Sequence, residues 1–190
     1  MNYLSNGGAL LVESTLGLYI LLLLIRFWMH WTNADFRNQI GHFFVLISNP
    51  VLLPFRNMIN TNRGFAYAVL AVAIVLMMIK HYLLLLLNGL SPAIQGVAVL
   101  GIADTIKTSV YIFIGAILIR IISSWIMPQG SYHPVMNIVY SLSEPLMAPA
   151  RRIIPAISGI DLSPILVFLF LNLSIEIIVK PIFGLGYSMI

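Results

Sequence analysis

The sequence carries one polar element twice, and this element is its best candidate for a binding site. Residues 48–57 read Ser-Asn-Pro-Val-Leu-Leu-Pro-Phe-Arg-Asn, and residues 143–152 read Ser-Glu-Pro-Leu-Met-Ala-Pro-Ala-Arg-Arg. Each copy holds two prolines four residues apart, and a proline inside a helix removes an N–H donor and clashes with the preceding turn. We therefore expect both pairs to end a helix and turn the chain. The prolines are Pro50 and Pro54 in the first copy and Pro145 and Pro149 in the second.

Arginines follow the second proline of each copy, namely Arg56 in the first and Arg151 and Arg152 in the second. The planar guanidinium donates paired hydrogen bonds that match a phosphate group. One interpretation is that these side chains bind anionic lipid headgroups or a partner protein. The other, which we favour slightly, is a structural turn with solvated charges.

The segment from Gly159 to Pro164, Gly-Ile-Asp-Leu-Ser-Pro, is typical of a turn that leads into a helix. Ser163 is a residue type preferred at the N-cap, and Pro164 suits the first helical position. Asp161 is expected either to stabilise the positive end of the helix dipole or to pair with Arg151 or Arg152.

Two arginines lie inside apolar runs, where a charge is costly and often functional. Arg26 comes five residues before Trp31, and Arg120 stands in the same relation to Trp125. One interpretation makes the arginines ion-binding or gating charges. We favour the other, in which each long side chain snorkels to the membrane interface, because tryptophan marks that interface.

Lys80 and Glu176 are predicted to reach similar depths in the membrane. The spacing from Gly64 to Lys80 is only one residue shorter than the spacing from Gly159 to Glu176, and the two glycines are equivalent in the repeated element. We hypothesise that Lys80 and Glu176 form an ion pair, which His81, aligned with Glu176, is placed to join. In the alternative, Glu176 pairs with Lys180 one helical turn later, and Lys80 snorkels alone.

The remaining polar residues indicate no catalytic centre. The four histidines are scattered without metal-ligand spacing, the six acids are sparse, and the absence of cysteine excludes thiolate metal sites. No glycine loop that would bind a phosphate is present. We expect no enzymatic activity, no cofactor and no metal.

Composition indicates which elements position these residues. The chain is 60% hydrophobic and 8% charged, whereas soluble domains carry about 25% charged residues, so lipid is the expected solvent. The basic residues cluster beside apolar runs, which argues against a nucleic-acid partner. Four runs are long enough to span a bilayer, which takes about 20 helical residues. They are residues 9–31, 65–90, 109–127 and 164–182.

Three further segments are too polar or too short to span. Residues 91–107 form either a re-entrant or interfacial segment or the early part of a long third span, and the sequence does not decide. Residues 38–53 and 134–147 are expected to lie along the membrane interface, with the apolar face toward the lipid. The predicted fold class is therefore an all-α membrane protein with about four transmembrane helices.

Matching anchors divide the chain into two units, residues 1–92 and 93–190. The Arg-to-Trp segments and the proline elements recur at offsets that differ by a single residue. Since each unit has two spans, both units should cross the membrane in the same direction, as hairpins that each carry an interfacial helix in the loop. Basic residues are more frequent in the loops that follow the first and third spans, which predicts that these loops are cytoplasmic and the termini external.

The second element, Pro145 to Pro155 with the Arg151–Arg152 pair, followed by Gly159 to Pro164, resembles the YggT family, also called YlmG. The resemblance covers nearly the whole chain, although the first copy has Asn57 and Ala66 where relatives often carry an arginine and an acid. It implies a cofactor-free multi-pass protein of the bacterial inner membrane. Bacterial relatives are linked to osmotic-stress tolerance and cell division, and plastid relatives to haem attachment to cytochrome b6.

Three functions are compatible with these observations. The first is a non-enzymatic membrane organiser that acts under osmotic or envelope stress, or at the division site, through anionic lipids and partner helices. Its partner would be an unidentified membrane protein or a second copy of the chain in a homo-oligomer. The second is a component of an ion pathway, and the third is an accessory factor for haem maturation.

Overall fold

The computed structural model describes residues 3–56, 62–126, 133–154 and 161–190, and every element in these ranges is helical. Pro155 and Gly159 lie outside the described residues, as do the side chains of Pro54 and Arg56. The elements are α1 (Tyr3–Trp31), α2 (Gln39–Arg56), α3 (Asn62–Leu87), α4 (Ile94–Ile126), α5 (Pro134–Ile153), α6 (Ser163–Ser174), the π-helix η1 (Ile175–Val179) and α7 (Lys180–Ser188).

Four described helices are long and apolar enough to cross a membrane, which confirms the predicted fold class. They are Asn6–Trp31, Gly64–Leu87, Ile94–Ile126 and the continuous rod Ser163–Ser188 formed by α6, η1 and α7. The segment that the sequence left undecided, residues 91–107, belongs mostly to the third span, because α4 begins at Ile94. Its small and polar residues are tolerated because most of them are buried against neighbouring helices rather than exposed to lipid.

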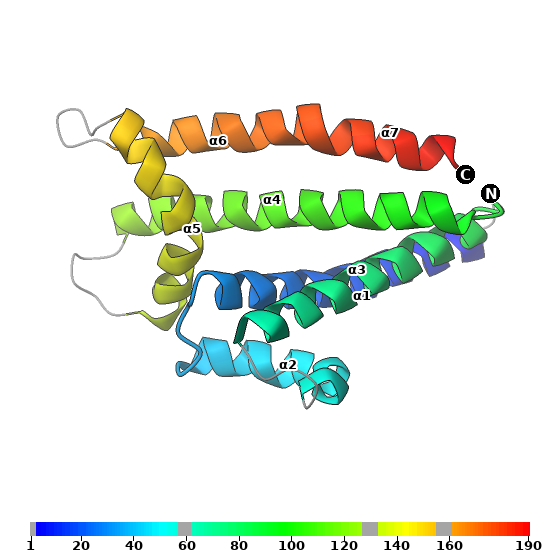
Figure 1. The fold of residues 1–190 in the computed structure, drawn as a ribbon, viewed down its shortest axis with the longest axis horizontal. Helices are drawn as coiled ribbons and strands as arrows, with labels where there is room; N and C mark the ends of the chain where they lie inside the picture. Colours follow the sequence, from blue (N-terminus) through cyan, green and yellow to red (C-terminus); the bar gives the residue numbers. More distant parts are fainter. Residues whose placement is uncertain (1–2, 57–61, 127–132, 155–160) are drawn as a thin grey trace.

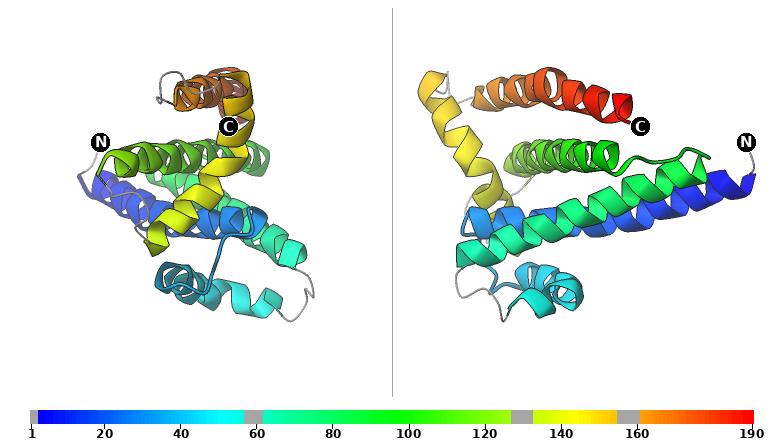
Figure 2. Two further views of the ribbon diagram at one scale, coloured as in Figure 1. Left: turned by 90° about the vertical axis from the view of Figure 1, so that its left-hand side faces the viewer. Right: turned by 45° about the vertical axis from the view of Figure 1, so that its right-hand side comes forward.

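The spans form layers, with α6–α7 on one side, α4 in the middle and the α1–α3 pair on the other (Figure 1). The two further views keep this order (Figure 2). α1 and α4 run in one direction, and α3 and α6–α7 run in the other. Both termini and the α3–α4 turn lie at one end, and α5 crosses the opposite end. α2 lies on the outer side of the α1–α3 pair, nearer the end that α5 crosses. The internal repeat and the side of the membrane on which each end lies stay predictions.

Apolar packing holds the layers together in two main clusters. Leu23 and Leu24 of α1 and Val69 of α3 are fully buried at the centre of the first. The second joins α4, α5 and α6 through residues such as Ile117 and Met147. α4 and α7 approach closely where two glycines meet, since a Cβ on Gly96 would lie 2.9 Å from the carbonyl oxygen of Gly186.

The prediction that the proline pairs end their helices is wrong. α2 continues past Pro50 to Arg56, and α5 contains both Pro145 and Pro149 before it ends at Ile153. An interior proline costs about 3 kcal/mol or more, mainly through a lost hydrogen bond and a clash. In α5 this cost is offset by burial of Met147 and Ala150 against α4 and α6, and the helix curves rather than stops (Figure 1).

Candidate functional site

Arg120 of α4 reaches across to the second proline element on α5. Its Nη1 donates a hydrogen bond to Ser143 Oγ at 2.9 Å and forms an ion pair with Glu144 Oε2 at 2.8 Å. The guanidinium carbon lies 4.6 Å from the ring centre of Tyr140, within the range of a cation–π contact. The side chain is only 15% exposed because α5 covers it, so its charge is met by partners on α5. The snorkelling interpretation of Arg120, in which this region lies at the membrane interface, stays a prediction. Glu144, one helical position after the serine, supplies an anionic partner inside the protein.

Glu144 extends this contact into a network that joins α4, α5 and the start of α6. Arg151 Nη1 lies 3.0 Å from Glu144 Oε1, and Arg151 Nε lies 3.2 Å from Asp161 Oδ2. The predicted pairing of Asp161 with Arg151 is therefore present. Arg152 is exposed at the end of the same helix.

The start of α6 differs from the prediction. Ser163 is the first residue of the helix and its side chain makes no capping hydrogen bond, so its assignment as the N-cap is wrong. Asp161 Oδ1 instead accepts the backbone N–H of Ser163 at 2.9 Å. A carboxylate satisfies this N–H better than a hydroxyl because it also interacts favourably with the helix dipole. Pro164 lies within the first turn, as expected.

The pKa values of both carboxyls reflect this network. Partial burial alone would raise the pKa of Glu144, but hydrogen bonds from Arg120 and Arg151 outweigh it and hold the pKa below the ordinary value. Burial likewise opposes the lowering at Asp161, where bonds from Ser163 and Arg151 again hold the pKa down. Both groups are therefore ionised at neutral pH and anchor the arginines.

A cleft of about 670 Å³ opens beside this network, between α4, α5 and α6. Arg120, Arg151 and Asp161 form its polar part, and Trp125 and Tyr140 add two aromatic rings. The rest of the lining is almost entirely apolar and comprises Ile117, Ile121, Met147, Leu162, Pro164 and Ile165, with Ser124. The cleft thus combines a charged region with a hydrocarbon-like wall.

The first proline element is contacted by Arg26 of α1 in a similar way. Arg26 Nη1 donates to Ser48 Oγ, to Asn49 Oδ1 at 3.1 Å and to the carbonyl oxygen of Val45 at 3.3 Å. Its guanidinium carbon lies 5.1 Å from the ring centre of Phe65. Arg26 is 4% exposed, so the snorkelling interpretation is wrong for Arg26. Acceptors on α2, of which only the Ser48 hydroxyl is buried, satisfy the charge within the protein.

A second charged cluster joins α3 and α4 near the end that carries the termini. Lys80 Nζ lies 2.6 Å from Asp104 Oδ2, and His81 Nε2 lies 3.1 Å from the same oxygen. The predicted Lys80–Glu176 pair is wrong, because Glu176 pairs with Lys180 at 2.6 Å on its own helix, the alternative considered from the sequence. A pocket of about 510 Å³ adjoins the cluster and also contacts Glu13 and Lys107.

Asp104 was missed as the partner of Lys80, although the sequence held a signal. The short turn between α3 and α4 makes the two helices antiparallel neighbours. Lys80 and Asp104 lie at equal separations on either side of Pro92, so a hairpin brings them to the same depth. Within the described residues, no group of three His, Asp or Glu side chains is placed to hold a metal ion.

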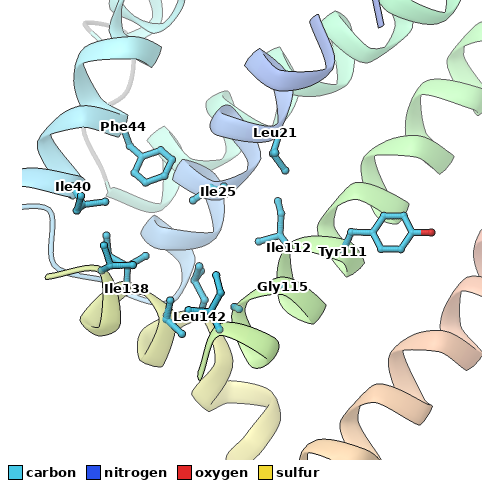
Figure 3. Close-up of a pocket in the computed structure, with 13 residues that line it drawn as sticks. Leu21, Ile25, Ile40, Phe44, Tyr111, Ile112, Gly115, Ile138 and Leu142 are labelled. Atoms are coloured by element: carbon cyan, nitrogen blue, oxygen red, sulfur yellow. The ribbon is translucent and has the colours of Figure 1, made fainter. Parts of the chain in front are cut away.

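A third pocket, of about 440 Å³, is apolar and lies between α1, α2, α4 and α5. Figure 3 shows Ile25 of α1, Phe44 of α2, Ile112 of α4 and Leu142 of α5 around it. The Tyr111 ring points away from these side chains. With no charged group in its lining, this pocket suits hydrocarbon and offers no means of recognising a headgroup.

Known proteins are similar to this sequence over most of its length. The sequence model of the CCB3/YggT family matches residues 5–87 and 99–182. A Vibrio alginolyticus protein described as an uncharacterized protein in the proC 3' region is 34% identical over 182 residues, which cover 93% of this chain and 97% of that protein. The uncharacterized protein YggT of Escherichia coli K12 is 32% identical, over 87% of this chain and 86% of its own length. No solved structure matches. The chain therefore belongs to the CCB3/YggT family.

Proposed function

We propose that this protein is a non-enzymatic organiser of the bacterial inner membrane that binds an anionic lipid in the cleft between α4, α5 and α6. It would act under osmotic or envelope stress, or at the division site. The observation that carries the proposal is the composition of the cleft, in which arginines and aromatic rings adjoin an apolar wall. A phospholipid has the matching parts, a phosphate and an acyl chain.

The arginines of the cleft retain capacity for a phosphate. A guanidinium has five N–H donors. Both hydrogen bonds of Arg120 to α5 use Nη1 alone. Arg152, exposed beside the network, adds a positive charge that Glu144 and Asp161 do not balance. Trp125 and Tyr140 are residue types that favour the headgroup level of a bilayer, which supports placing the cleft at the membrane interface.

Lipid binding by purified protein tests the proposal. We expect Arg151→Ala combined with Arg152→Ala to weaken binding of phosphatidylglycerol or cardiolipin roughly 30-fold. Each basic residue contributes about 1 kcal/mol at an anionic surface, and about 2 kcal/mol corresponds to that factor. Native mass spectrometry in mild detergent measures the bound lipid, and growth after osmotic shock measures the function.

Arg37→Ala is the matched control, because Arg37 is exposed and lies just before α2, away from the cleft. The control should change lipid binding much less than the double variant does. Equal lipid binding by the wild type and the double variant, with full growth after osmotic shock, would show that Arg151 and Arg152 do not bind lipid and serve the structure alone.

A second candidate function, participation in an ion pathway, is favoured by the Lys80–Asp104–His81 cluster beside its polar pocket. Ionisable groups within a span often mark ion or proton routes. Flux measured in proteoliposomes tests this candidate, with Asp104→Asn expected to abolish any flux that the wild type supports. Absence of proton, sodium and potassium flux in the wild type would dismiss it.

A further inference from the structure

The outer face of the fourth span carries charge at the middle of the membrane. Glu176 lies almost midway between Ser163 and Ser188, the two ends of the span. The side chain of Glu176 is 57% exposed, and that of its partner Lys180 is 63% exposed. Because a helix rises evenly along its axis, the carboxylate is close to the centre of the hydrocarbon core.

Most other charges within the described spans are covered by protein, and the half-buried Lys107 lies over two aromatic rings. The side chains of Lys80 and Asp104 are 9% and 12% exposed, and Arg26 is 4% exposed. Glu13 is also exposed, but it lies seven residues after Asn6, where its span begins, and so farther from the middle of its span than Glu176 does. Since charged groups at the bilayer centre normally face protein or a water-filled cavity, the exposed Glu176–Lys180 pair indicates a surface that another polypeptide covers.

Asn172 extends this surface by one helical turn. It is exposed, four residues before Glu176, and we call Asn172, Glu176 and Lys180 together the mid-span stripe. Exposed apolar residues, among them Leu173 and Ile177, flank the stripe, as is usual for a helix–helix contact in a membrane. The span lies at the edge of the molecule with α4 on its inner side (Figures 1 and 2). Because the side chains of the stripe are exposed, the stripe is open to a neighbour.

The backbone is irregular at the same place. The π-helix η1 spans Ile175–Val179, and the N–H of Lys180 donates to the carbonyl oxygen of Ile175, five residues back. Pro181, which follows, has no N–H to continue a regular ladder. π-Turns inside α-helices are frequent at functional sites, and this one sets the relative positions of Glu176 and Lys180.

We propose that a second copy of this chain covers the mid-span stripe, forming a homodimer through α6, η1 and α7. The stripe carries one negative and one positive charge, so it complements itself. Copies inserted in one orientation associate around a two-fold axis along the membrane normal, which brings identical residues to equal depth. Lys180 of each copy then lies one helical turn from Glu176 of the other, and the two crosswise ion pairs leave no net charge. The dimer does not depend on lipid binding at the cleft.

Disulfide crosslinking in membranes tests the dimer. The natural chain has no cysteine, so any disulfide between two copies must come from the introduced residue. Full-length protein carrying Ile177→Cys should form a disulfide-linked dimer on oxidation, since Ile177 is 69% exposed beside Glu176. Val75→Cys is the depth-matched control. Val75 is 53% exposed and lies almost midway between Gly64 and Leu87, at the middle of the second span on a different face.

Charge reversal tests the crosswise ion pairs in the Ile177→Cys background. Glu176→Lys makes the charges of the stripe all positive and Lys180→Glu makes them all negative, so either change alone should lower the crosslinked fraction at least tenfold. Coexpression of the two reversed chains, distinguished by tags, should restore a mixed dimer. Three results would overturn the proposal: crosslinking of Ile177→Cys no stronger than that of Val75→Cys, crosslinking to a different protein, or no recovery in the mixed pair.

Discussion

Two arginines on different spans contact the two copies of one proline element, with different outcomes. Arg26 on α1 and Arg120 on α4 each bond the serine that opens the element, Ser48 or Ser143. Each guanidinium also lies near an aromatic ring. Arg26 is buried completely in the core, whereas Arg120 lines an open cleft.

The residue after the serine accounts for much of this difference. Asn49 accepts one hydrogen bond from Arg26 as a neutral partner. Glu144, at the corresponding position, is an anion that holds Arg120 and Arg151 together, and Arg151 in turn holds Asp161. Two acids of the second copy, Glu144 and Asp161, therefore distinguish a charged network that faces a cavity from a closed contact that stabilises the fold.

The largest effect is expected at the closed contact. Arg26→Met should lower the free energy of unfolding by about 3 kcal/mol or more, because it leaves the buried Ser48 hydroxyl oxygen and the partly buried Asn49 Oδ1 without their donor, at about 1–3 kcal/mol each. Chemical denaturation in detergent micelles measures this loss, with the exposed Arg37→Met as control. A loss below about 1 kcal/mol would contradict the difference in burial.

Arg120→Met should cost about half as much, roughly 1–2 kcal/mol. Glu144 keeps Arg151 as a partner when Arg120 is removed, and the cleft admits water or headgroups to the freed groups. The same denaturation experiment compares the two arginines directly. Equal losses for Arg26→Met and Arg120→Met would show that the two contacts are energetically alike despite Glu144.

Glu144→Asn gives the second copy the side-chain type found in the first, and should cost about 1 kcal/mol. Glu144 is 46% exposed, and exposed ion pairs contribute little, about 0.2–1 kcal/mol each. A double-mutant cycle between Arg120→Met and Arg151→Ala measures the coupling that Glu144 transmits. That coupling should vanish in the Glu144→Asn background, and its persistence would mean that the arginines communicate by another route.

The smallest expected effect is a loss of stability at acidic pH, to which only the second copy of the proline element contributes. Glu144 and Asp161 have lowered pKa values in the folded protein, so their stabilisation is complete above their ordinary values of 4.5 and 3.8. This stabilisation is lost as the pH falls below about 4.5 and then through the lowered pKa values of the folded protein. The loss occurs because the carboxyls bind protons more readily in the unfolded chain. Glu144→Gln with Asp161→Asn should flatten this acid limb of the melting temperature, whereas Asn49→Ala should leave its slope unchanged.

Sequence reasoning found the four spans because continuous apolar runs of about 20 residues have few alternatives. It also offered the contact between Asp161 and Arg151 as one alternative, because only ten residues separate the two side chains along the chain. It placed Lys80 and Glu176 at similar depth, but depth alone does not determine which helices are neighbours. The real neighbour of α3 on this side is α4, which contributes Asp104.

Two further errors share one cause, the preference given to local rules over packing. The prolines of α5 were expected to end the helix, yet buried contacts with α4 and α6 keep it continuous. Arg26 was expected to reach toward lipid headgroups, yet acceptors on α2 lie nearer. In both cases the deciding residues come from a helix distant in sequence, which no local pattern reveals.

The antiparallel α3–α4 hairpin also has a consequence for how the chain enters the membrane. Lys80 alone makes α3 costly to release into lipid, and Asp104 alone does the same for α4, at up to about 2.5–3.5 kcal/mol each, the cost of a charge at a helix centre. Because the two charges contact at 2.6 Å, a hairpin that enters as one unit offsets both costs. We therefore expect α3 to stay at the translocon until α4 has emerged, so that both helices enter the lipid with the ion pair formed.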